Sequence, residues 1–415
     1  MRILMISTEY PPMKGGVGRY TKNLVTSLRN IGIDVYVACN EKGAGDFFGL
    51  DPNNRYNSDV LLGIVDKLHP DIVHVQYEQG LYGLSLGVVN PTNTSTNIDY
   101  FYSKCQIPIV TTFHSAYTFR QWMKLIVPIR KKETDNKFHI YACMLFDYWK
   151  HLINYQSFNN LNKQKIAKSR AGIVFSHYLS KLIGGGCNVI YHGAASPLSY
   201  GITKAEARSK LSLLPYSGNK KVALALGFLT ATKGWDILEK MDVPDEWVIV
   251  INSSKNHYSK ELTKLKIRNN KKIINMQKDF LSEEELSLLF CAADAVILPY
   301  KACSGSGVMF DALGHGLPFV ASNLRFFKEF STQNFGITVR KRDPNEFSMA
   351  LDTLGRNYST YKQAVDRFKK KLDWELVAQE HAKIYMKVMK KEITELISQR
   401  DERNLSNLSS NNINH

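Results

Sequence analysis

The sequence predicts an α/β protein made of two doubly wound domains, each built on a parallel sheet. A length of 415 residues exceeds one ordinary core, so two domains are expected. Short apolar runs alternate with helix-length stretches in both halves of the chain. Unbroken apolar strands of this kind are typical of parallel sheets covered on both faces. With 44% hydrophobic and 22% charged residues, a mostly disordered chain is excluded.

Twelve strands are expected from these runs. Six lie in the first half: Ile3–Ile6, Val35–Ala38, Ile72–Val75, Ile109–Phe113, Ile173–Phe175 and Val189–Tyr191. Six lie in the second: Val222–Leu226, Val248–Ile251, Ile273–Asn275, Ala295–Leu298, Phe319–Ala321 and Ile337–Val339. Helix starts are marked by a capping box from Ser282 to Glu285 and by Asp373, which can cap a long helix.

The first domain is expected over residues 1–192 and the second over 202–372. Residues 193–201 have the composition of a linker. A closing helix is expected over 373–398, and the Asn- and Ser-rich tail over 399–415 is expected to be disordered. Ligands bind outside the carboxyl ends of the strands in open parallel sheets, so the two domains should face a cleft.

The chain is basic, with 54 Lys and Arg against 38 Asp and Glu and a formal net charge of +16. Residues 116–170 hold 11 basic and 3 acidic side chains together with ten aromatic ones. Two interpretations are open: a helical insertion that contacts an anionic membrane surface or acceptor, or a solvated helical pair with a core-facing aromatic stripe. No recognition-helix, zinc-finger or RNA-binding signature supports a nucleic-acid partner.

The six cysteines are scattered without a C-x-x-C pair, which predicts reduced thiols in a cytoplasm. No apolar run is long enough to cross a membrane, so any membrane association is expected to be peripheral. The sequence contains neither D-x-D nor H-E-x-x-H, so we expect no metal site and no bound cofactor.

Three segments that follow strands carry candidate chemistry. Gly15 and Gly16 lie between the first strand and a helix, where backbone amides can approach a phosphate. Lys233 lies at a loop–helix junction and could neutralise a departing diphosphate. A helix preceded by Ser and Gly residues offers an anion-binding terminus, and Asp311 within it suits the hydroxyls of a ribose. The structural alternatives are a tight turn, a surface lysine and an acid favoured by the helix dipole.

Strand ends supply further candidates. His74 and His114 lie at the ends of two expected strands that face the cleft, although a lone histidine is more often structural. His114 is assigned to catalysis together with Lys233. The acceptor is assigned to Arg19, His74, Tyr77 and Glu78.

Taken together, these motifs resemble family 4 glycosyltransferases of the GT-B fold, collinearly over roughly residues 1–390. The resemblance is carried by Gly15-Gly16-Val17-Gly18-Arg19-Tyr20, Thr112-Phe113-His114, Tyr191-His192-Gly193, Lys233-Gly234, Leu298-Pro299, Ser306 to Pro318, and Trp374-Glu375 with Tyr385. It implies two Rossmann-like domains and a C-terminal helix that returns to the first domain. It also implies retaining, metal-independent hexosyl transfer from a nucleotide sugar. The expected acceptor is a glycan, lipid-linked or glycolipid molecule, and the basic, aromatic segment 116–170 is the reason to expect it at a membrane surface.

By this resemblance, Gly15 and Gly16 approach the diphosphate or the sugar, Lys233 pairs with the diphosphate, and His114 contacts the transferred sugar. The expected donor-binding set is Gly15, Gly16, Phe228, Lys233, Cys303, Ser304, Ser306, Gly307, Val308 and Asp311. Two positions depart from the family pattern: Phe228 stands where an arginine is usual, and Cys303 where a glutamate is usual.

The charge inventory favours dissociation of the sugar–phosphate bond, with the acceptor attacking from the same face. No pair of candidate carboxylates is expected to flank the cleft, which disfavours a double displacement. Three other functions remain open: a sugar-nucleotide enzyme of the same fold, such as a hydrolysing epimerase or small-glycoside synthase; a nucleic-acid-binding protein; and a non-catalytic subunit, suggested by Phe228 and Cys303.

Overall fold

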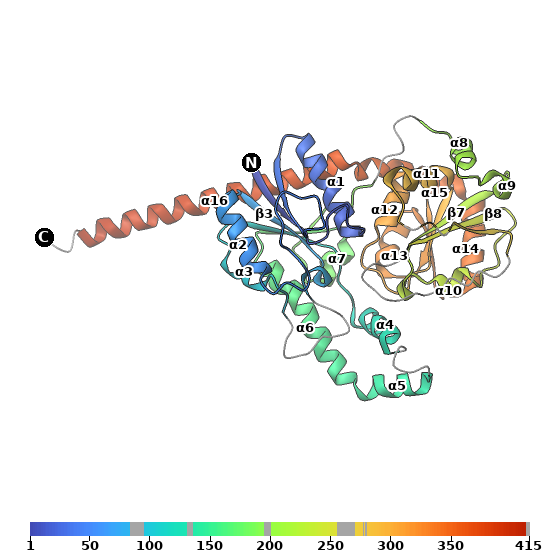
Figure 1. Ribbon diagram of the computed structural model, residues 1–415, viewed down its shortest axis with the longest axis horizontal. Coiled ribbons are helices and arrows are strands. Elements are labelled where there is room, and N and C mark those ends of the chain that lie inside the picture. Colours follow the sequence, from blue (N-terminus) through green and yellow to red (C-terminus); the bar gives the residue numbers. More distant parts are fainter. Residues whose placement is uncertain are drawn as a thin grey trace.

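The computed structural model describes residues 1–83, 95–130, 136–194, 201–254, 270–276, 278 and 280–411. It contains two six-stranded parallel sheets with helices packed around them (Figure 1). All twelve expected strands are present, and the predicted two-domain α/β fold is confirmed. Most of the expected linker, residues 195–200, lies outside the described residues.

The first sheet has the strand order β2-β1-β3-β4-β5-β6. Its strands are β1 (Arg2–Ile6), β2 (Asp34–Ala38), β3 (Ile72–Tyr77), β4 (Ile109–Phe113), β5 (Ala171–Val174) and β6 (Asn188–Val189). The helices of this half are α1 (Gly16–Asn30), α2 (Asn57–Leu68), the 3-10 helix η1 (Gln79–Tyr82), α3 (Asp99–Lys104), α4 (Phe119–Arg130), α5 (Lys137–Phe146), α6 (Tyr148–Ala167) and α7 (His177–Leu182).

The second sheet has the strand order β12-β11-β10-β7-β8-β9. Its strands are β7 (Lys221–Phe228), β8 (Trp247–Ser254), β9 (Ile273–Asn275), β10 (Ala295–Leu298), β11 (Phe319–Ser322) and β12 (Gly336–Val339). Its helices are α8 (Lys204–Lys210), α9 (Leu214–Ser217), η2 (Ala231–Lys233), α10 (Trp235–Leu238), α11 (Glu283–Ala292), α12 (Gly307–Gly314), α13 (Arg325–Ser331), α14 (Pro344–Arg356), α15 (Tyr358–Phe368) and η3 (Lys369–Leu372).

Alternate residues of each central strand pack into different cores, because successive side chains point to opposite faces of a sheet. In β1, Ile3 and Met5 enter one apolar cluster, while Leu4 and Ile6 enter another. The cluster that holds Ile3 continues into the second domain, where it includes Val222 of β7. A shared core therefore fixes the two domains against each other.

The last helix, α16 (Trp374–Asn411), returns from the second domain to the first (Figure 1). The Tyr20 hydroxyl lies 3.3 Å from Nε2 of His381, and Nδ1 of His74 lies 2.6 Å from the Tyr385 hydroxyl. The expected return of this helix is confirmed. The expected disorder does not hold for residues 399–411, because α16 continues to Asn411, and residues 412–415 lie outside the described residues. Residues 391–403 are rich in strong helix formers, so a helix that has already started extends through them.

Helices α4, α5 and α6 form an arm that projects from the first domain (Figure 1). Residues 116–170 contain ten aromatic side chains, and each interpretation of this segment holds for half of them: five pack into a core and five are exposed. Five form a small core within the arm: Tyr117, Phe119, Trp122, Tyr155 and Phe158. Five are exposed: Phe138, Tyr141, Phe146, Tyr148 and Trp149. None of the helices that the structure describes has an apolar stretch able to span a bilayer.

Candidate functional site

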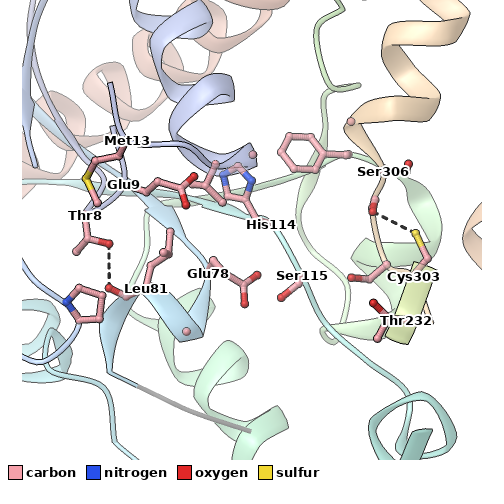
Figure 2. A pocket seen from close by; sticks show the side chains of 18 of the residues that line it. Thr8, Glu9, Met13, Glu78, Leu81, His114, Ser115, Thr232, Cys303 and Ser306 are labelled. Carbon is pink, nitrogen blue, oxygen red and sulfur yellow. Dashed lines mark hydrogen bonds between the residues drawn. The ribbon is translucent and has the colours of Figure 1, made fainter. Parts of the chain in front are cut away.

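Two cavities lie between the domains, at the carboxyl ends of the strands. The larger has a volume of about 960 Å³ and the smaller about 220 Å³. Both are lined by Gly16, His192, Lys233 and Gly307, so these four residues mark the junction between the cavities. Figure 2 shows the larger cavity. The cleft expected from the sequence is therefore present, and it contains two connected compartments.

Lys233 is placed by a tight turn between β7 and α10. Its ammonium lies 3.9 Å from the centre of the Tyr300 ring. Gly227, at φ +144°, allows the stem of Lys233 to pass, because a Cβ there would lie 3.3 Å from the lysine Cε. Gly234, at φ +76°, allows the turn to approach β10, since a Cβ would lie 1.8 Å from the Pro299 carbonyl oxygen. The turn thus holds a cation at the junction of the two cavities.

The N-terminus of α12 supplies a second positive element at the same junction. Ser306 caps the helix by accepting a hydrogen bond from the Met309 amide at 3.2 Å. The preceding loop packs on the first domain, where the Ala116 amide donates to Oγ of Ser304 at 3.3 Å. Helix N-termini attract anions through their free amides and the helix dipole. Figure 2 shows Ser306 and Cys303 on one side of the cavity, opposite His114.

Cys303 occupies a position where the resemblance leads one to expect a glutamate. Burial raises the pKa of its thiol to about 12, although the nearby Lys233 acts in the opposite direction. Its Sγ donates to the Gly305 carbonyl at 3.1 Å. The Cys303 side chain is therefore uncharged where it lines the cavity, and it cannot accept a hydrogen bond from a sugar hydroxyl as a carboxylate would.

Asp311 lies in the smaller cavity and forms an ion pair across the cleft. Nη1 of Arg19 donates to its Oδ2 at 2.5 Å, and the same guanidinium binds Glu283 through Nε at 2.5 Å and Nη2 at 2.7 Å. Burial acts to lower the pKa of Arg19, but the two carboxylates outweigh it and the pKa is raised. Arg19 therefore lines the smaller cavity beside Asp311 and does not line the larger one, and its expected acceptor role stays a prediction. A carboxylate has about four lone-pair sites, so Asp311 can also accept ribose hydroxyls.

The Gly-rich turn before α1 is arranged around a side chain that sequence reasoning missed. The Glu9 carboxylate accepts a hydrogen bond from the Gly18 amide at 2.7 Å, and a Cβ on Gly15 would lie 1.9 Å from that carboxylate. The α1 N-terminus thus already faces the Glu9 carboxylate, and of the glycines in this turn only Gly16 lines both cavities. The sequence signal that could have revealed Glu9 is an acidic residue between a buried strand and a glycine-rich turn. Gly15 lines only the smaller cavity.

His114 lies at the end of β4 and lines the larger cavity. Its Nε2 is 2.9 Å from Oε1 of Gln76, while the amide nitrogen of Gln76 faces Sδ of Met5 at 3.1 Å. Because an amide oxygen can only accept, Nε2 carries the proton and Nδ1 is the accepting nitrogen. Burial, aided by His192, lowers the pKa of His114 to about 3. The ring is therefore neutral and can accept a bond from a sugar hydroxyl.

Two expected acceptor residues lie outside both cavities. His74 is fully buried, with Nδ1 bonded to Tyr385 and Nε2 2.8 Å from Oγ1 of Thr112. Tyr77 is 1% exposed and stacks on Tyr82. Their assignment to the acceptor is wrong, because both faces of β3 are covered: the two side chains point to opposite faces, and both lie in the protein interior. These two residues join the sheet to α16 and to neighbouring aromatic side chains.

Glu78 does line the larger cavity, and burial raises its pKa, with Glu9 adding to the effect. Figure 2 shows Glu78 beside Ser115, below Glu9 and His114. Glu9 and Glu78 share this cavity, a pair that sequence reasoning did not bring together, but both come from the first domain. The expectation that no carboxylate pair flanks the cleft therefore stays a prediction. The placement of Glu9 and Glu78 could not be read from the sequence, because 69 positions separate two residues that parallel pairing of β1 with β3 brings together.

The smaller cavity has an aromatic and polar end that suits a planar ring. Phe228 and Phe280 lie with their ring centres 6.4 Å apart, and Asn252 and Ser254 line the same compartment. Val308 of α12 lines it as well. Phe228 and Val308 were expected on the donor side; Phe280, Asn252 and Ser254 were missed, although the latter two lie at the end of β8.

Among the described residues, no group of three or more His, Cys, Asp and Glu side chains is placed to hold a metal ion. The absence of a metal from the reaction stays a prediction.

Comparison with solved structures identifies the architecture. Sucrose-phosphate synthase from Thermosynechococcus elongatus superposes with a TM-score of 0.61 at 14% identity, over 94% of this chain and 99% of that chain. HepE from Anabaena, in complex with UDP-glucose, has the same TM-score and identity, over 93% of this chain and 100% of that chain. The protein therefore has the two-domain GT-B fold.

A third structure, the catalytic domain of starch synthase IV from Arabidopsis thaliana bound to ADP and acarbose, gives a TM-score of 0.58 at 12% identity, over 94% of this chain and 99% of that chain. At these identities the likeness establishes the fold alone. A scan of protein-family models finds no match to the chain. A search of curated proteins finds no match either.

Proposed function

We propose that the protein is a metal-independent, retaining hexosyltransferase that moves a sugar from a nucleotide diphosphate sugar to a hydroxyl of a glycan, lipid-linked or glycolipid acceptor. The single observation that carries this proposal is the convergence of Lys233 and the α12 N-terminus at the junction of two cavities. A diphosphate at this junction would place its nucleoside in the smaller cavity and its sugar in the larger one. UDP-sugar and ADP complexes of proteins with the same fold support this assignment.

In the proposed reaction, the bond between the anomeric carbon and the diphosphate oxygen breaks, and its electron pair leaves with the phosphate. Lys233 and the amides at Gly307 stabilise the charge that develops there, and fixed charges of this kind are often the largest contribution to catalysis. The acceptor oxygen bonds to the anomeric carbon on the same face. Its proton passes to the departing phosphate oxygen, so the configuration is retained.

The neutral His114 ring would orient the transferred sugar by accepting a hydroxyl hydrogen bond at Nδ1. Glu78, at the end of the neighbouring strand β3, would bind the acceptor. In this mechanism Glu78 positions a hydroxyl and takes no proton, since the phosphate is the base. The positive charge that a metal could offer the diphosphate comes from Lys233 and α12.

The proposal is tested by release of nucleoside diphosphate from UDP-, GDP- and ADP-sugars, measured with and without glycan or glycolipid acceptors and with a chelator. The expected result is acceptor-dependent release that the chelator leaves unchanged, with a product whose anomeric proton coupling in NMR shows the configuration of the donor. Equal release without acceptor would favour a hydrolysing sugar-nucleotide enzyme. Nucleotide binding without turnover of any donor would favour a non-catalytic subunit.

A further inference from the structure

The outer end of the arm carries a dense group of exposed apolar side chains. Five are mostly exposed: Phe146 at 91%, Phe138 at 83%, Leu145 at 78%, Trp149 at 72% and Tyr141 at 66%. We call the exposed apolar surface of α5 and the first turns of α6 the apolar elbow; its members are Phe138, Tyr141, Leu145, Phe146, Tyr148, Trp149 and Ile153. Exposed apolar residues are normal when scattered singly, but a contiguous group marks an interaction surface.

The arm has a small core of its own, formed by α4, α6 and the residues just before α4. Trp122, Phe158 and Leu161 are buried between α4 and α6. The Tyr155 hydroxyl donates to the Tyr117 carbonyl at 2.9 Å. This small core contains five of the ten aromatic side chains. Helix α5, which follows α4, lies away from both sheets (Figure 1).

Charge indicates which partner the elbow suits. Residues 116–170 hold 11 basic and 3 acidic side chains. Two of the basic ones, Lys165 and Arg170, pair with Asp99 and Glu392 outside the segment, which leaves a clear basic excess. Pairing of two elbows in a dimer would bring these like charges together. An anionic surface complements them, and Trp and Tyr are the side chains favoured at a membrane interface.

We propose that the apolar elbow inserts into the interface of an anionic lipid membrane, with the basic arm held against the headgroups. The surface would act as a monotopic anchor, which needs apolar burial and electrostatic attraction together. This anchor is independent of the transferase chemistry proposed above.

The root of the arm connects the anchor to the larger cavity. Nε2 of Gln121 donates to the Cys303 carbonyl at 3.0 Å, and Tyr117 lines the cavity. Docking of the elbow would therefore hold the acceptor compartment at a set distance from the membrane surface. This geometry suits an acceptor that is itself attached to lipid. Unlike the membrane anchor, this statement about the acceptor rests on the proposed function.

The test is flotation of the full-length protein with phosphatidylcholine vesicles, with and without phosphatidylglycerol, in the absence of any nucleotide sugar. The test variant is Phe146→Ser/Trp149→Ser. The matched control is Met349→Ser/Leu376→Ser, which removes exposed apolar side chains elsewhere on the surface. Circular dichroism checks that each variant folds, as expected for exposed positions.

Wild type and the control should float with the anionic vesicles, and added salt should weaken the binding. The elbow variant should partition about 100-fold more weakly, since each aromatic side chain contributes roughly tenfold. Failure of wild type to bind anionic vesicles, or unchanged binding by the elbow variant, would overturn the proposal. A dimer in light scattering that the elbow variant dissociates would also overturn it and assign the surface to a second copy. None of these outcomes bears on the transferase assay with water-soluble acceptors.

Discussion

Replacing Lys233 with alanine should lower kcat/KM by about 100- to 1000-fold, the usual effect of removing one preorganised group that stabilises developing negative charge. The structural effect should be small. The lysine makes a cation–π contact with Tyr300 at 3.9 Å, which is worth about 1 kcal/mol or less at a partly exposed position. The assay is steady-state release of nucleoside diphosphate with a saturating acceptor, alongside thermal unfolding of the same preparation.

Lys301→Ala is the matched control for this substitution. Lys301 lies three residues beyond the end of β10, pairs with Asp236 at 3.2 Å and lines neither cavity. It should retain wild-type kinetics. Wild-type kcat/KM in Lys233→Ala would refute the role given to this cation, and a loss matched by Lys301→Ala would show that the assay reports general surface charge.

Three further outcomes are expected. Asp311→Asn should weaken donor affinity by about 10- to 100-fold in isothermal titration, since charged hydrogen bonds to the ribose are lost; unchanged affinity would contradict its role. Gln76→Glu should raise the pKa of His114 from about 3 and introduce an acid limb into the pH–rate profile that wild type lacks above pH about 4. Glu78→Gln should keep kcat within about tenfold of wild type, whereas a loss of 1000-fold or more would identify Glu78 as a general base and indicate inversion.

The fold could be predicted almost completely from the sequence, for a physical reason. Strands of parallel sheets are buried on both faces, so their apolar runs are continuous and easily recognised, as in Val222–Leu226. The end of each run also locates the cleft. Lys233, His114 and Asp311 could therefore be placed near one site without any knowledge of packing.

The direction and partners of individual side chains could not be predicted in the same way. His74 and His114 lie on the same face of neighbouring strands, both beside Gln76. They differ in position along the strands, since His74 lies mid-strand beneath α16 whereas His114 follows the end of β4 and lines the cavity. Arg19 binds Asp311 from a position 292 residues away, a pairing that only domain packing creates. Glu9 was missed because its importance depends on the close approach of Gly15 and Gly18, which is a property of the folded turn.

The most direct test of the account is thermal unfolding in the presence of UDP, GDP and ADP. At a concentration of about 100 times its dissociation constant, the cognate nucleotide should stabilise the protein by about 2.7 kcal/mol. Lys233→Ala/Asp311→Asn should lose most of that stabilisation at the same concentration. Equal stabilisation of the wild type and the double variant, or none by any of the three nucleotides, would contradict a diphosphate site at the junction of the two cavities.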